Sequence, residues 1–186
     1  MERKTLIDDL ERVLLTPEEI NARVAELGRR ITNDFRGEEV RLVGILKGAF
    51  MFFADLSRQI DLPVSMDFMA ISSYGKATKS SGVVRIIKDL DNDITGKNVI
   101  IVEDIIDSGM SLSFLKENLI SRGAKSLKIC VLLDKPDRRR TQIDVDYVGF
   151  TIPDEFVVGF GLDYAEQYRA LPMIGVLKPS VYSRKD

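Results

Sequence analysis

The sequence contains no histidine and a single cysteine among its 186 residues. Without an imidazole, histidine-based triads, histidine-ligated metal sites and histidine general bases are excluded, so acid–base chemistry must fall to Asp, Glu, Lys or Tyr. Cys130 lies in the apolar run 127–133, where it is typical of core packing in a reducing compartment. One cysteine also excludes an intrachain disulfide framework.

The chain has little net charge and no long apolar run. Its 27 basic and 29 acidic residues are interspersed and leave a formal net charge of -2. No global positive field therefore indicates nucleic acid or an anionic membrane as the main partner. No stretch approaches the ~20 apolar residues of a membrane span, and the N-terminus lacks the apolar core of a secretory signal. We expect a cytoplasmic protein with neither a nucleic-acid nor a membrane partner.

The pattern of apolar residues predicts one α/β domain over residues 1–186. Thr16 and Glu19 form a capping-box pattern around Pro17, which predicts a helix over about 16–35. Short β-branched runs then alternate with helical patterns, which favours a mostly parallel central sheet flanked by helices. The expected strands are 40–46, 64–71, 83–88, 99–102 and 126–133, and the expected helices are 50–60 and 111–122.

The most informative stretch is 99–112, an apolar strand followed by Glu103 and Asp104, a small-residue turn and a helix. Ligands of open parallel sheets bind at the carboxyl ends of the strands, so this turn is where a site is expected. Backbone N–H groups and hydroxyls of residues 107–111 can bind a phosphate at the helix N-terminus. Two carboxylates beside that phosphate would repel a bare anion. Their presence therefore indicates a bound Mg²⁺ ion, a sugar diol that donates hydrogen bonds, or both. The alternative is a turn whose polar residues only cap the helix.

The stretch Val102-Glu103-Asp104-Ile105-Ile106-Asp107-Ser108-Gly109 resembles the phosphoribosyl pyrophosphate loop of the type I phosphoribosyltransferases. Stretches 46–48, 72–75, 132–136 and 148–169 further resemble the hypoxanthine-guanine enzymes of that family, and the similarity runs in order from about residue 38 to the end. The resemblance implies Mg²⁺-dependent transfer of phosphoribosyl from phosphoribosyl pyrophosphate to a 6-oxopurine. It also implies a small hood region, to which about 150–186 contribute, and a mobile lid loop.

On the phosphoribosyl side, the resemblance implies that Glu103 and Asp104 bind the ribose hydroxyls, with or near a magnesium ion. Asp107 would be the catalytic residue, a general base that accepts or shares the proton of the purine N7. The residues implied for phosphoribosyl and pyrophosphate binding are Lys47, Gly48, Glu103, Asp104, Asp107, Ser108, Gly109, Met110, Ser111 and Arg169.

On the purine side, Lys135 matches the lysine that donates to the purine O6, a choice that favours 6-oxo over 6-amino purines. Phe156 would stack on the base, Val157 would meet its edge through backbone groups, and Asp163 would hold a second magnesium. Ser73 and Tyr74 would belong to the lid, which keeps water from the reactive sugar.

Other functions remain open at this point. A related enzyme could prefer xanthine, since the groups near the purine C2 are not resolved by sequence. A regulator of this fold that binds RNA should lose the loop carboxylates or gain a basic face, and here the one dense basic cluster is 138–140. A plain α/β binding domain would leave the ordered motifs unexplained. By the family habit we expect a homodimer or homotetramer.

Overall fold

The computed structural model describes residues 5–73 and 84–183 and contains two sheets. The larger sheet has six strands in the order β4-β3-β2-β5-β6-β7, of which only β4 runs antiparallel to its neighbour. The prediction of a mostly parallel sheet is therefore confirmed. The strand bounds are β2 Val40–Leu46, β3 Val64–Ser73, β4 Val84–Lys88, β5 Asn98–Ile106, β6 Ser126–Asp134 and β7 Tyr147–Thr151.

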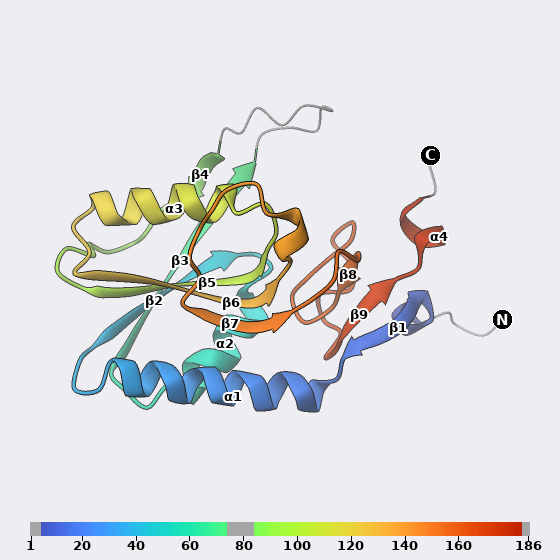
Figure 1. Ribbon diagram of the computed structural model, residues 1–186, viewed down its shortest axis with the longest axis horizontal. Helices are drawn as coiled ribbons and strands as arrows, with labels where there is room; N and C mark the ends of the chain where they lie inside the picture. The colour runs from blue at the N-terminus through green and yellow to red at the C-terminus, as the bar shows by residue number, and fades with distance from the viewer. Residues whose placement is uncertain (1–4, 74–83, 184–186) are drawn as a thin grey trace.

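Helices cover both faces of this sheet, because its central strands are apolar on both sides (Figure 1). Leu42 and Ile100 pack toward α1 (Pro17–Asp34) and α2 (Phe50–Gln59). Val43 and Ile101, one residue further along the same strands, pack toward α3 (Met110–Ser121) on the other face. Alternate residues of one strand point to opposite faces, so a single strand contributes to both cores.

Helix α1 begins where the sequence predicts. Thr16 accepts a hydrogen bond from the Glu19 backbone at 3.3 Å, and Glu19 accepts one from the Thr16 backbone at 2.8 Å. The helix then buries one apolar face against the sheet. Its buried residues include Ile20, Val24, Leu27 and Ile31.

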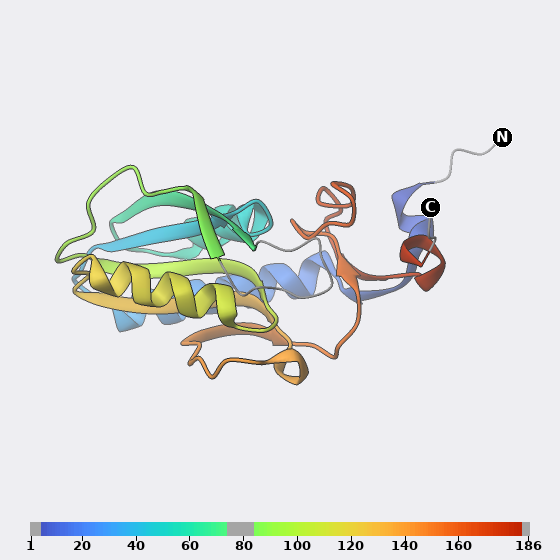
Figure 2. The same cartoon turned by 90° about the horizontal axis from the view of Figure 1, so that it is seen from above.

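A second, three-stranded antiparallel sheet forms the hood, in the order β1-β9-β8. Strand β1 (Leu10–Leu15) follows the short helix η1 (Leu6–Asp9) near the N-terminus. Strands β8 (Val157–Val158) and β9 (Ile174–Leu177), followed by α4 (Pro179–Tyr182), come from the other end of the chain. Figure 2 shows this hood to one side of the central sheet, so both ends of the chain meet there.

The predicted lid lies at the limit of the described residues. Strand β3 ends at Ser73, and Tyr74 lies outside the described residues. The lid therefore stays a prediction. A separate finding is that no helix within residues 5–73 and 84–183 is long and apolar enough to cross a membrane.

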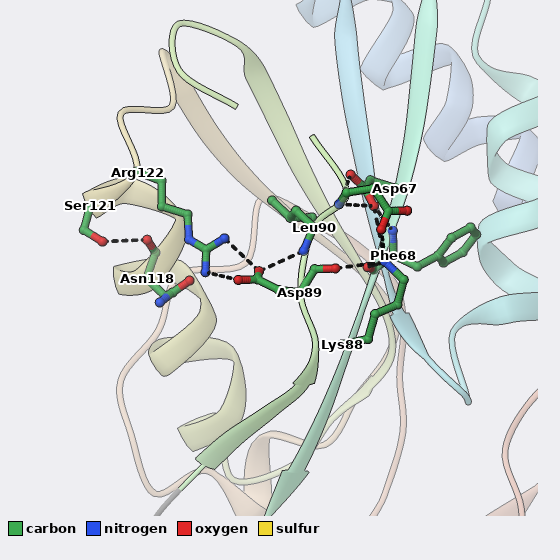
Figure 3. Close-up of polar contacts among 9 residues, drawn as sticks. Asp67, Phe68, Lys88, Asp89, Leu90, Asn118, Ser121 and Arg122 are labelled. Atoms are coloured by element: carbon green, nitrogen blue, oxygen red, sulfur yellow. Dashed lines mark hydrogen bonds and ion pairs between the residues drawn. The ribbon is translucent and has the colours of Figure 1, made fainter. Parts of the chain in front are cut away.

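A polar network ties β3 to the connection between β4 and β5 and to the end of α3 (Figure 3). Asp67 is 3% exposed and accepts hydrogen bonds from the backbone of Phe68 at 2.8 Å and of Asp91 at 3.1 Å. Arg122 makes a bidentate ion pair with Asp89 at 2.7 and 2.9 Å. A buried carboxylate such as Asp67 stabilises a fold only while its hydrogen-bond donors are present.

Replacing Asp67 with Ala is therefore expected to lower the free energy of unfolding by about 2–3 kcal/mol, since two backbone donors lose their acceptor. Urea unfolding followed by circular dichroism measures this loss. The exposed Asp61→Ala is the control and should stay within about 0.5 kcal/mol of wild type. Equal stability of the two variants would show that the network does not stabilise the protein.

Candidate active site

Two adjacent carboxylates lie inside β5, on the wall of a pocket of about 270 Å³. Strand β5 runs to Ile106, four residues beyond the predicted end at Val102, because Ile106 still pairs with Asp134 of β6. Burial is the main cause that raises the pKa of Glu103 well above its ordinary value, and it also raises the pKa of Asp104. These buried oxygens are suited to a cation or to hydroxyl donors.

The turn after β5 has the geometry of a phosphate cradle. Gly109 has φ +81° and is the N-cap residue of α3, whose first turn faces the pocket through Ser111 and Leu112. Helix N-termini carry free N–H groups and positive partial charge, so they attract anions. Predicted residues Glu103, Asp104, Asp107, Ser108, Gly109 and Ser111 all line this one pocket.

The segment after β6 braces the turn from outside. The backbone N–H groups of Arg140 and Thr141 both donate to the Ser108 carbonyl, at 2.9 and 3.1 Å. Arg139 pairs with Asp134, and its Cδ lies 3.2 Å from where a Cβ on Gly109 would stand. The turn is thus held on a folded support and is closely packed around its glycine.

Asp107, the predicted general base, faces this same segment. Its Oδ1 lies 3.2 Å from Nε of Arg138, and Nη1 of Arg138 lies 3.3 Å from Asp154. Arg138 therefore links the phosphate turn to the predicted purine segment. The sequence shows Arg138 only as part of a basic cluster, because the run of three arginines gives no sign of which side chain turns toward the site.

The predicted residues Lys47 and Gly48 directly follow Leu46, which lines the pocket. The peptide bond between Leu46 and Lys47 is cis, and it directly precedes the bond that joins the predicted residues Lys47 and Gly48. Gly48 packs so closely that a Cβ there would stand 1.7 Å from Oδ2 of Asp104. A Cβ on Gly161 of the hood would meet the Gly48 carbonyl at 2.1 Å. Only glycine fits at Gly48 unless Asp104 moves.

The two predicted pyrophosphate cations, Lys47 and Arg169, share the carboxylate of Glu166, which no sequence motif marks as a site residue. Glu166 lies 2.9 Å from Nζ of Lys47 and 3.6 Å from Nη2 of Arg169. Arg169 also pairs with Asp163 at 2.8 Å and donates to the Gly161 carbonyl at 2.8 Å. The feature that sets Glu166 apart is its φ of +61°, and a sequence does not reveal that angle. No sequence signal for Glu166 was therefore available.

The predicted purine residues lie directly after β6 and in or next to the hood strand β8. Lys135 is only 6% exposed, and its Nζ donates to the Glu155 carbonyl at 2.5 Å. Burial lowers the pKa of Lys135, while neighbouring carboxylates, including Asp107, oppose this shift. Val157 is buried in β8, whereas Phe156 is 40% exposed. A buried lysine beside an accessible aromatic ring can bind a flat base that carries an oxygen.

Comparison with known proteins identifies the family. A family model described as the phosphoribosyl transferase domain matches residues 14–165. The hypoxanthine-guanine phosphoribosyltransferase of Bacillus subtilis is 55% identical over 174 residues, which cover 94% of this chain and 97% of that protein. The chain belongs to the hypoxanthine-guanine phosphoribosyltransferase family.

Further relatives agree with this placement. The hypoxanthine-guanine phosphoribosyltransferase of Mycobacterium tuberculosis is 54% identical over 180 residues, covering 94% of this chain and 89% of that protein. A crystal structure of a hypoxanthine phosphoribosyltransferase from Staphylococcus aureus superposes with a TM-score of 0.93 at 52% identity, over 98% of this chain and all of that one. The type I phosphoribosyltransferase fold is thereby confirmed.

The acidic residues of this phosphoribosyltransferase fit magnesium that arrives with a phosphorylated substrate. Mg²⁺ usually keeps several waters and is held by one or two carboxylates together with substrate phosphates. Glu103 and Asp104 offer such a pair, and within residues 5–73 and 84–183 no group of three or more acidic or cysteine side chains forms a complete protein cage. Asp163 is engaged with Arg169 and with the Glu166 backbone at 2.9 Å.

Because Glu166 pairs with two cations that are predicted to face an anionic substrate, Glu166→Gln is expected to lower the KM for phosphoribosyl pyrophosphate, by roughly two- to fivefold for exposed ion pairs of this kind. Steady-state kinetics at fixed purine concentration measure this change, and it should shrink as salt is added. Glu117→Gln, an exposed change on α3, is the control. A higher KM in Glu166→Gln would contradict the competing role of Glu166.

Proposed function

We propose that this phosphoribosyltransferase salvages purines by transferring 5-phosphoribosyl from phosphoribosyl pyrophosphate to hypoxanthine or guanine. The products are IMP or GMP and pyrophosphate. The observation that carries the proposal is the single pocket in which a carboxylate pair adjoins the phosphate turn, with the buried Lys135 nearby. We further propose that residues 1–186 work as one domain, in a cytoplasmic homodimer or homotetramer.

The phosphoribosyl group would be held from two directions. Residues 107–111 would bind its 5′-phosphate at the α3 N-terminus, where Gly109 lets the backbone approach closely. Glu103 and Asp104 would accept hydrogen bonds from the ribose hydroxyls and, with Asp163 at a second position, would hold magnesium. The bound metal would supply positive charge to the departing pyrophosphate.

The reaction needs no covalent nucleophile from the protein, and catalysis would rest on stabilising the charge of the leaving group. A purine ring nitrogen attacks C1′ of the ribose while the bond from C1′ to pyrophosphate breaks, through a state resembling an oxocarbenium ion. Lys47, the Gly48 backbone and Arg169 would stabilise the charge that develops on pyrophosphate. Asp107 would accept or share the proton of the purine N7, which leaves the base electron-rich enough to attack. Ser73 and Tyr74 would limit access of water.

The purine side would select a 6-oxo group. Lys135 would donate to O6, Phe156 would stack on the ring, and the Val157 backbone would meet the edge of the base. An exocyclic amine cannot accept from an ammonium group, so adenine should be excluded. Backbone groups around Val157 do not by themselves separate guanine from xanthine, and a xanthine preference remains a second candidate within this same chemistry.

The direct test is nucleotide formation from phosphoribosyl pyrophosphate and Mg²⁺, with hypoxanthine, guanine, xanthine and adenine supplied in separate reactions. We expect hypoxanthine and guanine to react and adenine not to react. A fastest reaction with xanthine would change the substrate assignment. If phosphoribosyl pyrophosphate binds and no purine reacts, the alternative of a nucleotide-responsive regulator that binds RNA would replace the enzyme.

Replacing Lys135 with Ala is expected to weaken use of 6-oxopurines, because the donor to O6 is lost. A hydrogen bond to a charged group predicts a rise in the KM for hypoxanthine of roughly ten- to a hundredfold. The KM for phosphoribosyl pyrophosphate should change far less, and steady-state kinetics with each substrate varied measure both. Lys97→Ala, at an exposed position just before the amino end of β5, is the control. A parallel rise in both KM values would contradict the donor role.

A further inference from the structure

The C-terminal turn α4 places an aromatic ring against the purine-binding segment. Tyr182 stacks on Phe156 with ring centroids 5.0 Å apart and an angle of 21° between the rings. Tyr164 of the hood meets Phe156 at 5.7 Å in a perpendicular arrangement. Phe156 is 40% exposed, so burial alone does not fix the orientation of its ring. The stacked neighbour supplies a contact that does so.

Helix α4 is fastened to the N-terminal part of the chain. The backbone of Lys178 donates to the Asp9 carbonyl at 3.0 Å, and its Nζ donates to the Asp8 carbonyl at 2.6 Å. Val181 packs on a buried cluster that includes Leu10 and Leu177. Tyr182 is therefore presented from a supported turn and not from a free end.

The backbone of the purine-binding segment is fixed separately from its ring. The Leu177 N–H donates to the Phe156 carbonyl at 2.9 Å, and Glu155 forms an ion pair with Arg12 of β1. The Glu155 carbonyl also accepts from Lys135. These contacts hold the main chain, which leaves the ring orientation of Phe156 to its aromatic neighbours.

Helix α4 and the pocket lie on different sides of the hood strands β8 and β9. Figures 1 and 2 both show α4 beyond β8 and β9 as seen from the central sheet, whereas the pocket lies at the carboxyl ends of the central strands. Tyr182 is the last residue of α4, so the backbone that carries it lies on that outer side of the hood. Tyr182 covers one face of the Phe156 ring, and a flat base bound beside Lys135 would stack on the other face.

We propose that Tyr182 is a positioning residue for purine binding: it backs the Phe156 ring so that this ring is already oriented when the base arrives. This inference rests on the proposed function. Holding a side chain in its bound orientation lowers the entropy cost of binding, and the two rings already stack at 5.0 Å with an angle of 21° between them. The base would then complete a stack of three rings.

The test compares three variants at position 182. Tyr182→Ala should raise the KM for hypoxanthine roughly three- to tenfold, the factor that one aromatic pair contributes. The KM for phosphoribosyl pyrophosphate and the kcat at saturating substrates should stay within about twofold, because the stack acts on base binding alone. Tyr182→Phe should restore the wild-type KM, and Tyr182→Leu, which keeps apolar volume without a ring, should not. Ser183→Ala, on the same turn, is the control.

Several results would overturn the proposal. An unchanged KM for hypoxanthine in folded Tyr182→Ala would show that Phe156 needs no support. A lower KM would show that Tyr182 occupies space the base needs, and an equal rise for both substrates would indicate a general structural role. If Tyr182→Ala does not fold, the KM for hypoxanthine is compared between Tyr182→Phe and Tyr182→Leu, and equal values in the two variants would overturn the proposal. A wild-type protein that makes no nucleotide from any 6-oxopurine is a different failure, that of the proposed function.

Discussion

Replacing Asp107 with Asn is expected to lower kcat by about 10²–10⁴, the usual contribution of a general base. An amide of the same shape cannot accept the N7 proton, but it leaves the backbone of the phosphate turn in place. The affinity for phosphoribosyl pyrophosphate should therefore stay within about threefold of wild type. Single-turnover kinetics and calorimetric binding of phosphoribosyl pyrophosphate measure the two quantities separately.

Asp137→Asn is the matched control for this change, since Asp137 is an exposed carboxylate of the helix η2 (Pro136–Arg138). It should retain wild-type kcat. Wild-type turnover in Asp107→Asn would exclude Asp107 as the base. A loss of binding equal to the loss of turnover would instead assign Asp107 to substrate binding.

Replacing Gly48 with Ala is expected to reduce kcat/KM for phosphoribosyl pyrophosphate by at least about a hundredfold, since a displacement of catalytic groups by 1 Å can have an effect of that size. The new Cβ would stand 1.7 Å from Oδ2 of Asp104, so Asp104 or the loop must move. Steady-state kinetics measure the loss, and far-ultraviolet circular dichroism checks that the fold is kept.

Gly96→Ala is a suitable control for that experiment. Gly96 has φ +71° and open space around its Cβ position, so alanine there should cost about 1 kcal/mol of stability and leave turnover unchanged. If Gly48→Ala keeps wild-type kcat/KM, the close contact with Asp104 has no role in placing that carboxylate.

The central sheet could be predicted because its signals are local. Strand β2 occupies Val40–Leu46 as expected, and α1 begins after Thr16, since an apolar run and a capping box each act over a few residues. The phosphate turn was found for the same reason. Its carboxylates, glycine and helix start lie within one stretch of sequence, and the structure brings them to one pocket.

The hood could not be predicted in this detail because its contacts are distant in sequence. Strand β1 pairs with β9, so that Leu10 lies opposite Leu177, and nothing in a six-residue segment specifies a partner so far away. The ion pairs of Arg138 and Glu166 have the same origin: they depend on how loops fold over the sheet. Roles drawn from the resemblance, including those of Ser73 and Tyr74, remain predictions.

The pairing of β1 with β9 also imposes an order on biosynthesis. The phosphate turn and its supporting strands lie within residues 40–134, so that half of the site can assemble while the chain is still being translated. The base-binding half must wait, because β1 stays an unpaired edge until Leu177 has left the ribosome. A ribosome-bound nascent chain stalled before β9 should therefore bind a sugar phosphate before it can distinguish one purine from another.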